Sequence, residues 1–155
     1  MTEDTFDVIV IGAGPAGYVC AIRCAQLGLR TACIDPRTNS RDEPAPGGTC
    51  LNVGCIPSKA LLDSSLHFEQ LHKDFTEHGI FVDTVELDIP QMMERKNRIV
   101  GELADGIDML FKANGVTAIH GYGRILPEHC VEVTPVTDSQ TPSILASRYV
   151  VIATG

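Results

Sequence analysis

The feature that most constrains the fold is a short apolar run followed at once by regularly spaced glycines. Asp7 to Ile11 is β-branched and ends at Gly12, as a buried parallel strand does. Pro15 to Leu27 predicts a helix that Gly28 ends, and Thr31 to Asp35 predicts a second strand. A strand, a helix and a strand within about 30 residues form a βαβ unit, whose crossover is right-handed in nearly all proteins.

Each glycine of Gly12-Ala13-Gly14-Pro15-Ala16-Gly17 has a physical task in such a unit. The first permits the tight turn, the second lets an anion approach bare backbone, and the third lets helix and strand pack closely. The N–H groups at the helix start then face the anion. Asp35 follows Gly17 by 18 positions, where a carboxylate holds an adenosine ribose and disfavours a 2′-phosphate. Against the alternative of a glycine-rich turn without a ligand, these offsets predict a dinucleotide site made of Gly12, Gly14, Pro15, Ala16, Gly17 and Asp35.

The middle of the chain predicts two helices and two irregular segments. Pro36 to Pro46 is a polar loop, and a helix begins near Thr49 and continues through Phe68. Residues 75–88 look irregular, with room for one short strand. The clearest helix covers Pro90 to Asn114, between a capping Asp88 and Gly115. Helical spacing predicts that its buried face consists of Met92, Ile99, Leu103, Ile107 and Leu110.

The last third of the chain predicts short strands. They are Val116–His120, Arg124–Leu126, Cys130–Thr134 and Arg148–Ile152, with a turn at Gly121–Gly123 and a connection from Pro135 to Ser147. The predicted fold class is α/β: a Rossmann-like parallel sheet with helices and an attached antiparallel β-meander.

Cys50 and Cys55 lie five positions apart, behind Gly47-Gly48. In a regular helix their Cα atoms would be about 8.6 Å apart, from a rise of 1.5 Å and a turn of 100° per residue. A disulfide needs about 4.4–6.8 Å, so the bond is feasible only if the regular helix starts late. Gly54 and Pro57 favour a transition between the two sulfurs. The alternative is two unpaired core cysteines.

A closed ring this small confers little loop entropy, so it suits exchange better than structure. The helix start and Lys59 add positive charge, which raises the thiolate fraction available to attack a disulfide. The setting therefore favours a redox-active pair.

The remaining cysteines are predicted to be reduced, because no secretory signal accompanies them. Cys20, Cys24 and Cys33 fall in apolar segments, and Cys130 falls in a strand-like run. Cys20 and Cys24 share a helix face, but no second ligand pair at zinc spacing accompanies them. The sequence predicts no metal site.

Composition and charge exclude several classes of function. With 20 acidic against 12 basic side chains the formal charge is −8, which disfavours nucleic acid as a partner. The acidic start resembles neither a secretory signal nor a transit peptide, and no run approaches the roughly 18 apolar residues of a membrane span. The sequence predicts a cytoplasmic protein, with the mitochondrial matrix after processing as the alternative.

A family resemblance rests on Gly47-Gly48-Thr49-Cys50-Leu51-Asn52-Val53-Gly54-Cys55-Ile56-Pro57. This stretch resembles the active-site signature of class I pyridine nucleotide–disulfide oxidoreductases. The extension Ser58-Lys59-Ala60-Leu61-Leu62 is most similar to members that oxidise dihydrolipoyl groups. Glutathione reductases usually carry a second lysine at the position of Ser58, and mercuric reductases usually carry valine at the positions of Leu51 and Ile56. Gly121–Gly123 and Ala153–Gly155 also resemble FAD-domain segments of the family, and the 36–46 loop is longer than in many relatives.

The resemblance implies an FAD site. By that correspondence Gly12, Gly14 and Gly17 cradle the pyrophosphate and Asp35 holds the ribose. Cys55 is the sulfur nearest the flavin, Cys50 exchanges with the substrate, and Lys59 lies near the flavin N5. Further implied contacts are Gly48, Thr49, Tyr122, Gly123, Ala153, Thr154 and Gly155.

The implied reaction passes electrons from a dihydrolipoyl group through the cysteine pair and FAD to NAD⁺. Implied partners are a second subunit, giving a homodimer, and lipoyl domains of 2-oxo acid dehydrogenase complexes or the glycine-cleavage carrier protein. The alternatives are another disulfide reductase of the class, of mercuric or glutathione type, and a non-catalytic flavin-binding or redox-sensing module.

The chain stops directly after a strand, at Ala153-Thr154-Gly155. We therefore expect residues 1–155 to be the truncated N-terminal part of an FAD-binding domain, inert alone, with the NAD-binding and dimerisation domains and the catalytic His–Glu pair elsewhere. No catalytic role is predicted for His67, His72, His78, His120 and His129.

Overall fold

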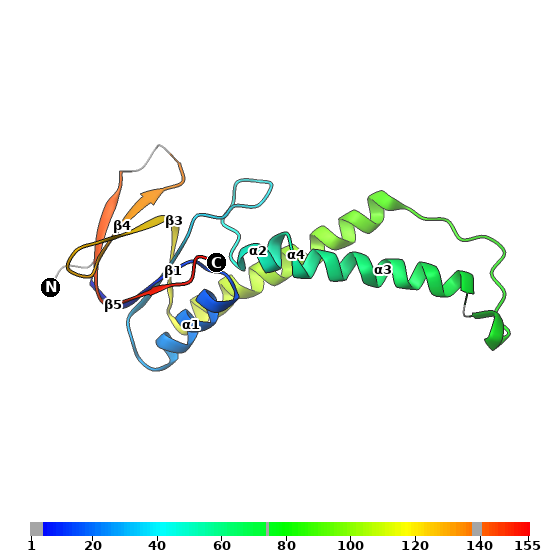
Figure 1. The fold of residues 1–155 in the computed structure, drawn as a ribbon, viewed down its shortest axis with the longest axis horizontal. Helices are drawn as coiled ribbons and strands as arrows, with labels where there is room; N and C mark the ends of the chain where they lie inside the picture. Colours follow the sequence, from blue (N-terminus) through cyan, green and yellow to red (C-terminus); the bar gives the residue numbers. More distant parts are fainter. Residues whose placement is uncertain (1–4, 74, 138–140) are drawn as a thin grey trace.

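The computed structural model describes residues 5–73, 75–137 and 141–155. In these residues, five strands close into one sheet with a parallel and an antiparallel part (Figure 1). β1 pairs in parallel with β2 and β5, β2 pairs in parallel with β3, and β4 pairs antiparallel with β3 and β5. The predicted parallel sheet with an antiparallel meander is therefore confirmed. The strands are β1 (Thr5–Ile11), β2 (Thr31–Asp35), β3 (Thr117–Leu126), β4 (Cys130–Pro135) and β5 (Ser143–Ile152).

The helices are α1 (Pro15–Gln26), α2 (Gly48–Asn52), α3 (Cys55–Lys73) and α4 (Ile89–Asn114), with a 3₁₀ turn at Phe75–His78. The prediction of one continuous helix from Thr49 is wrong, because the chain kinks at Val53 and Gly54. Both N–H groups donate to the Thr49 carbonyl, at 3.0 and 2.8 Å, which ends α2. Described residues 75–88 contain no strand.

The predicted turn at Gly121–Gly123 is wrong, since both glycines lie inside β3. β3 pairs with β2 up to His120 and with β4 from Gly121 onward. A Cβ at Gly121 would come within 2.7 Å of the Thr134 carbonyl oxygen. Glycine is therefore required because two backbones approach closely where the strand passes between the two parts of the sheet.

The predicted connection from Pro135 to Ser147 is too long. β5 begins at Ser143, and its first residues pair with β4 from Val133↔Ser143 to Cys130↔Ala146. Leu145 is buried in the meander core, but exposed neighbours obscure this pattern in the sequence. Residues 138–140 lie outside the described chain.

Alternating side chains of β1 serve two cores. Val8 and Val10 pack with Ile107 and Phe111 of α4 on the helical side, whereas Ile9 packs against the meander. The apolar face predicted for α4 is only partly right, because Leu103 and Leu110 are 43% and 48% exposed. The buried residues of α4 are Ala104, Ile107 and Phe111.

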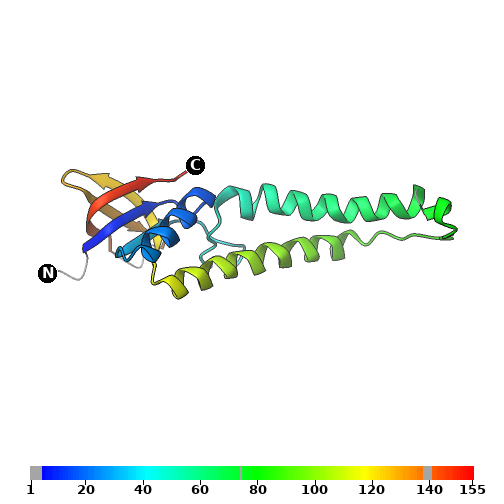
Figure 2. The ribbon, with the colours of Figure 1, turned by 90° about the horizontal axis from the view of Figure 1, so that it is seen from below.

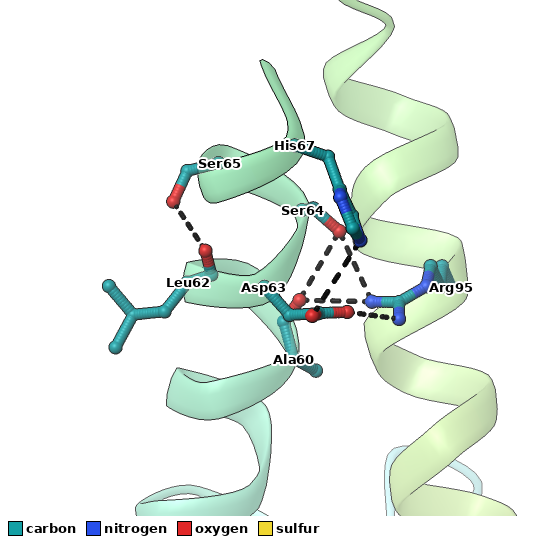
Figure 3. Close-up of polar contacts among 7 residues, drawn as sticks. All are labelled: Ala60, Leu62, Asp63, Ser64, Ser65, His67 and Arg95. Carbon is teal, nitrogen blue, oxygen red and sulfur yellow. Dashed lines mark hydrogen bonds and ion pairs between the residues drawn. The ribbon is translucent and has the colours of Figure 1, made fainter. Parts of the chain in front are cut away.

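α3 and the N-terminal part of α4 form an arm that projects from the sheet, with the two helices side by side (Figures 1 and 2). The predicted cap is confirmed, since Asp88 Oδ1 accepts from Gln91 N–H at 2.9 Å. Arg95 of α4 ties the helices together by donating to the Ala60 carbonyl, Ser64 Oγ and Asp63 Oδ2, at 3.0, 3.1 and 2.7 Å (Figure 3). Within the described residues, no helix has the length and apolar character needed to cross a bilayer.

Candidate functional site

A cleft of about 610 Å³ opens beside the carboxyl ends of β1 and β2. Most of the predicted cofactor contacts line it, although they come from distant parts of the sequence. These lining residues are Gly14, Pro15, Ala16, Asp35, Gly48, Thr49, Cys50, Tyr122, Ala153, Thr154 and Gly155. The predicted contacts outside this lining are Gly12, Gly17, Cys55, Lys59 and Gly123.

At two of the motif glycines, the lack of a side chain lets neighbouring backbone segments approach closely. Gly12 has φ of +104°, and a Cβ there would overlap the Ala153 carbonyl oxygen. A Cβ on Gly17 would overlap the Gly12 carbonyl oxygen, as expected for close contact between helix and strand. Gly123 also packs closely, because a Cβ there would lie 3.1 Å from the Ile11 side chain.

Gly14 and Gly48 leave bare backbone at the cleft. A Cβ on Gly48 would lie 2.7 Å from Gly14 Cα, and the nearest atom to a Cβ on Gly14 would be Gly48 Cα at 3.9 Å. Gly14 is also the N-cap of α1, whose first N–H groups have no partner within the helix. This cradle fits the pyrophosphate of a dinucleotide, since an anion can reach backbone donors without meeting a side chain.

Asp35 is fixed at the end of β2 by two backbone donors. Its Oδ2 accepts from Ala13 N–H at 2.6 Å, and its Oδ1 accepts from Arg37 N–H at 2.9 Å. Each carboxylate oxygen has a further lone pair. The side chain is half-buried and lines the cleft, so it can also accept from a ligand hydroxyl.

Cys50 and Cys55 are joined by a disulfide with Cα atoms 4.7 Å apart. The kink between α2 and α3 provides this short distance, which a regular helix does not allow. α3 begins at Cys55, so Pro57 is its third residue and lies in the first turn, where proline is tolerated. Cys50 lines the cleft, whereas Cys55 and Lys59 are exposed outside its lining.

Sequence reasoning missed Arg37 and its neighbours Pro36 and Thr38, which also line the cleft. Arg37 Nη2 donates to Thr49 Oγ1 at 3.2 Å. The available signal was position: a cation two residues after the strand-end acid stands close to the expected ligand. The loop composition concealed this signal, because most loop cations face solvent.

The other cysteines are free, as predicted. Cys33 is buried, and its pKa is raised to about 12. The largest cause is burial, followed by the nearby Asp35 and then Cys20. Burial, followed by the nearby Cys24, raises the pKa of Cys20. The thiols of Cys20 and Cys33 therefore stay protonated at neutral pH.

The described residues contain no cluster of three or more His, Cys, Asp or Glu side chains arranged to hold a metal ion. His67, His78 and His129 are exposed, and His120 lines a separate cavity of about 200 Å³. The side chain of His72 lies outside the described structure.

Residues 6–155 match the family model of the pyridine nucleotide-disulphide oxidoreductases, and the chain belongs to this family. Among curated relatives, it is 46% identical over 153 residues to dihydrolipoyl dehydrogenase 1, mitochondrial, of Arabidopsis thaliana, covering 99% of this chain and 29% of the relative. It is 45% identical over 152 residues to dihydrolipoyl dehydrogenase of Cupriavidus necator, covering 97% and 31%. It is 45% identical over 150 residues to dihydrolipoyl dehydrogenase, mitochondrial, of Sus scrofa, covering 96% and 28%. The chain thus spans less than a third of the length of these relatives.

Proposed function

We propose that the polypeptide carrying this chain is a flavin disulfide oxidoreductase that oxidises dihydrolipoyl groups, and that this chain binds its FAD. The observation that carries the proposal is the position of Cys50, which is disulfide-bonded and lines the same cleft as the glycine cradle and Asp35. A bonded cysteine at the edge of a dinucleotide site suits electron transfer better than structural support. The names of the similar relatives favour the dihydrolipoyl substrate.

Bound FAD would be held by residues of the cleft. Gly14 and Gly48 would receive the pyrophosphate, and Asp35 would accept from the ribose hydroxyls, because all three line the cleft. Thr49 would contribute on the flavin side, and Tyr122 and Ala153–Gly155 would border the rest of the cofactor. Lys59 and Gly123 lie outside this lining, and we propose that they act from beside the cleft. Bound there, FAD would supply the two-electron chemistry that links the cysteine pair to NAD⁺, for which we propose a site in a domain outside this chain.

The chain's own chemistry is dithiol–disulfide exchange. A substrate thiolate attacks Cys50 Sγ, the bond between the two cysteine sulfurs breaks, and Cys55 leaves as a thiolate. The second substrate thiol attacks the substrate sulfur of this mixed disulfide, its proton passes to the released Cys50 sulfur, and the lipoyl disulfide leaves. The substrate has lost two electrons, and the cysteine pair has gained them.

The proposed partners follow from this reaction. They are a second subunit and the lipoyl domains of 2-oxo acid dehydrogenase complexes, or the carrier protein of glycine cleavage. The relatives include mitochondrial enzymes and a bacterial one, so we propose the cytoplasm or the mitochondrial matrix as the location.

The test is a comparison of substrates with the complete polypeptide. We expect NAD⁺ reduction with dihydrolipoamide and little turnover with oxidised glutathione or Hg²⁺. Activity confined to either of the latter would reject the proposed substrate. Oxidation of the cysteines without any change in flavin absorbance would instead favour a redox sensor.

A further inference from the structure

Arg37 is a charged group without a part in the exchange reaction. Among the described residues that line the cleft, it is the one cationic side chain. Its guanidinium donates to Thr49 Oγ1 at 3.2 Å. The side chain therefore reaches from the loop after β2 to the start of α2, and its positive charge lies there. Thr49 directly follows Gly48, which forms the bare backbone of the cleft together with Gly14.

The backbone of Arg37 is fixed on both sides. Its N–H donates to Asp35 Oδ1 at 2.9 Å, and its carbonyl accepts from Ala45 N–H at 3.0 Å. These bonds hold Arg37 between the strand-end acid and the returning end of the 36–46 loop. With the backbone fixed in this way and Nη2 bonded to Thr49 Oγ1, the guanidinium is partly ordered before a ligand binds, so less conformational entropy is lost on binding.

Asn39 closes the same loop. Its Oδ1 accepts from Arg41 N–H at 2.8 Å and from Glu43 N–H at 3.1 Å, and its own N–H donates to the Glu43 carbonyl at 2.8 Å. The loop is thus an ordered turn rather than a loose insertion. Asn39 does not line the cleft, so we expect its effect on a ligand to pass through the loop residues that do, with Arg37 as the charged one.

We propose that Arg37 is a pyrophosphate anchor and that the long 36–46 loop positions it. The proposal rests on the proposed FAD site. A guanidinium offers a planar fork of donors that matches phosphate oxygens. The chain carries a formal charge of −8, which repels an anionic ligand, so a local cation beside the cradle has a large role.

The first test measures FAD affinity after removal of flavin from the complete polypeptide. Arg37→Gln removes the positive charge but keeps the backbone N–H that donates to Asp35 Oδ1. Because the ionic contact is lost, FAD binding should weaken at least about tenfold. Arg41→Gln is the matched control, because Arg41 lies in the same loop, pairs with Glu43 at 3.0 Å and is 77% exposed. Unchanged affinity in Arg37→Gln overturns the inference, whereas a wild-type protein that binds no FAD refutes the proposed function itself.

The second test separates phosphate from nucleoside recognition by competition of ADP and adenosine against FAD. Arg37→Gln should weaken ADP and leave adenosine unchanged. The wild-type affinity for ADP should also fall more steeply with added salt than that of the variant, because the lost contact is ionic. Equal weakening of both competitors would place the side chain on the base or ribose and overturn the anchor.

The third test concerns Asn39 as a positioning residue. Asn39→Ala should weaken FAD binding in the wild-type background and have little further effect in Arg37→Gln, because its influence passes through the guanidinium. Arg37→Lys should restore the salt dependence and only part of the affinity. Additive losses in the double variant would show that the loop does not act through Arg37.

Discussion

The sheet body and the α3/α4 arm differ in what fixes their sequences. In the body, Ile9, Val10 and Ile34 are fully buried, and motif glycines stand where another side chain would meet backbone. In the arm and the segment that joins its two helices, no described side chain between positions 61 and 99 is buried; Leu62 of α3 is 66% exposed and Phe81 of the joining segment is 77% exposed. The stability of the sheet body therefore depends on close packing of buried side chains, whereas the stability of the arm depends on contacts between its two helices.

The largest expected effect is in the body. Gly17→Ala places a Cβ of α1 on the Gly12 carbonyl oxygen, and because this contact is with backbone, the helix or the strand end must shift. We expect a loss of more than about 4 kcal/mol of unfolding free energy, together with loss of FAD binding. Urea denaturation measures it. A variant within about 1 kcal/mol of the wild type would show that the body tolerates changes as the arm does.

The next effect belongs to the arm. Arg95→Met removes three hydrogen bonds between α4 and α3, one of them to a carboxylate (Figure 3). We expect a cost of about 1.5–3 kcal/mol. Hydrogen exchange should rise in the arm and remain slow in β1 and β2. Arg98→Met is the control, because its exposed pair with Glu102 is worth about 0.3–0.5 kcal/mol. Equal effects of the two variants would contradict the assigned role of Arg95.

The body should also respond to alkaline pH through Cys33. Its folded pKa of about 12 lies above the ordinary 9.0, so the unfolded chain loses this proton first. This contribution to stability is therefore present below pH 9 and is lost as pH rises toward 12, by about 1.4 kcal/mol at pH 10. Cys33→Ala should flatten the decline by that amount. An unchanged slope would mean that Cys33 is not buried as described.

The smallest effect has the opposite sign. Gly106 lies inside α4, and a Cβ there would meet nothing within 4 Å. Gly106→Ala should therefore stabilise the protein by about 0.5–1 kcal/mol, because alanine loses less backbone entropy in a helix. Thermal unfolding measures the gain. Destabilisation would indicate that this helical glycine has a close neighbour, as Gly17 has.

The sequence predicted what depends on neighbours along the chain. The βαβ unit and the cap at Asp88 follow from local spacing and side-chain chemistry. The turn at Gly121–Gly123 was misread because a glycine serves equally in a turn and at a close approach of two strands. The exposure of Leu103 and Leu110 was missed because helical periodicity shows which residues share a face but not which neighbour covers it.

The cleft was predictable only in part. Its glycines and Asp35 follow a fixed spacing, and Cys50 belongs to a motif of high specificity. Arg37 was missed because its importance depends on the path of the 36–46 loop, which Asn39 and Ala45 determine through contacts that no local pattern reveals.

The central claim is that the disulfide of Cys50 and Cys55 exchanges electrons with FAD in the cleft. The most direct measurement is an anaerobic titration of the complete flavin-loaded polypeptide with a dithiol, following flavin absorbance and thiol alkylation together. We expect both cysteines to become alkylated as the absorbance changes. Cys50→Ser should keep its FAD, show no flavin response to the dithiol, and have Cys55 alkylated whether or not dithiol is added, because the disulfide is gone. Alkylation of the pair with no change in flavin absorbance would contradict the account.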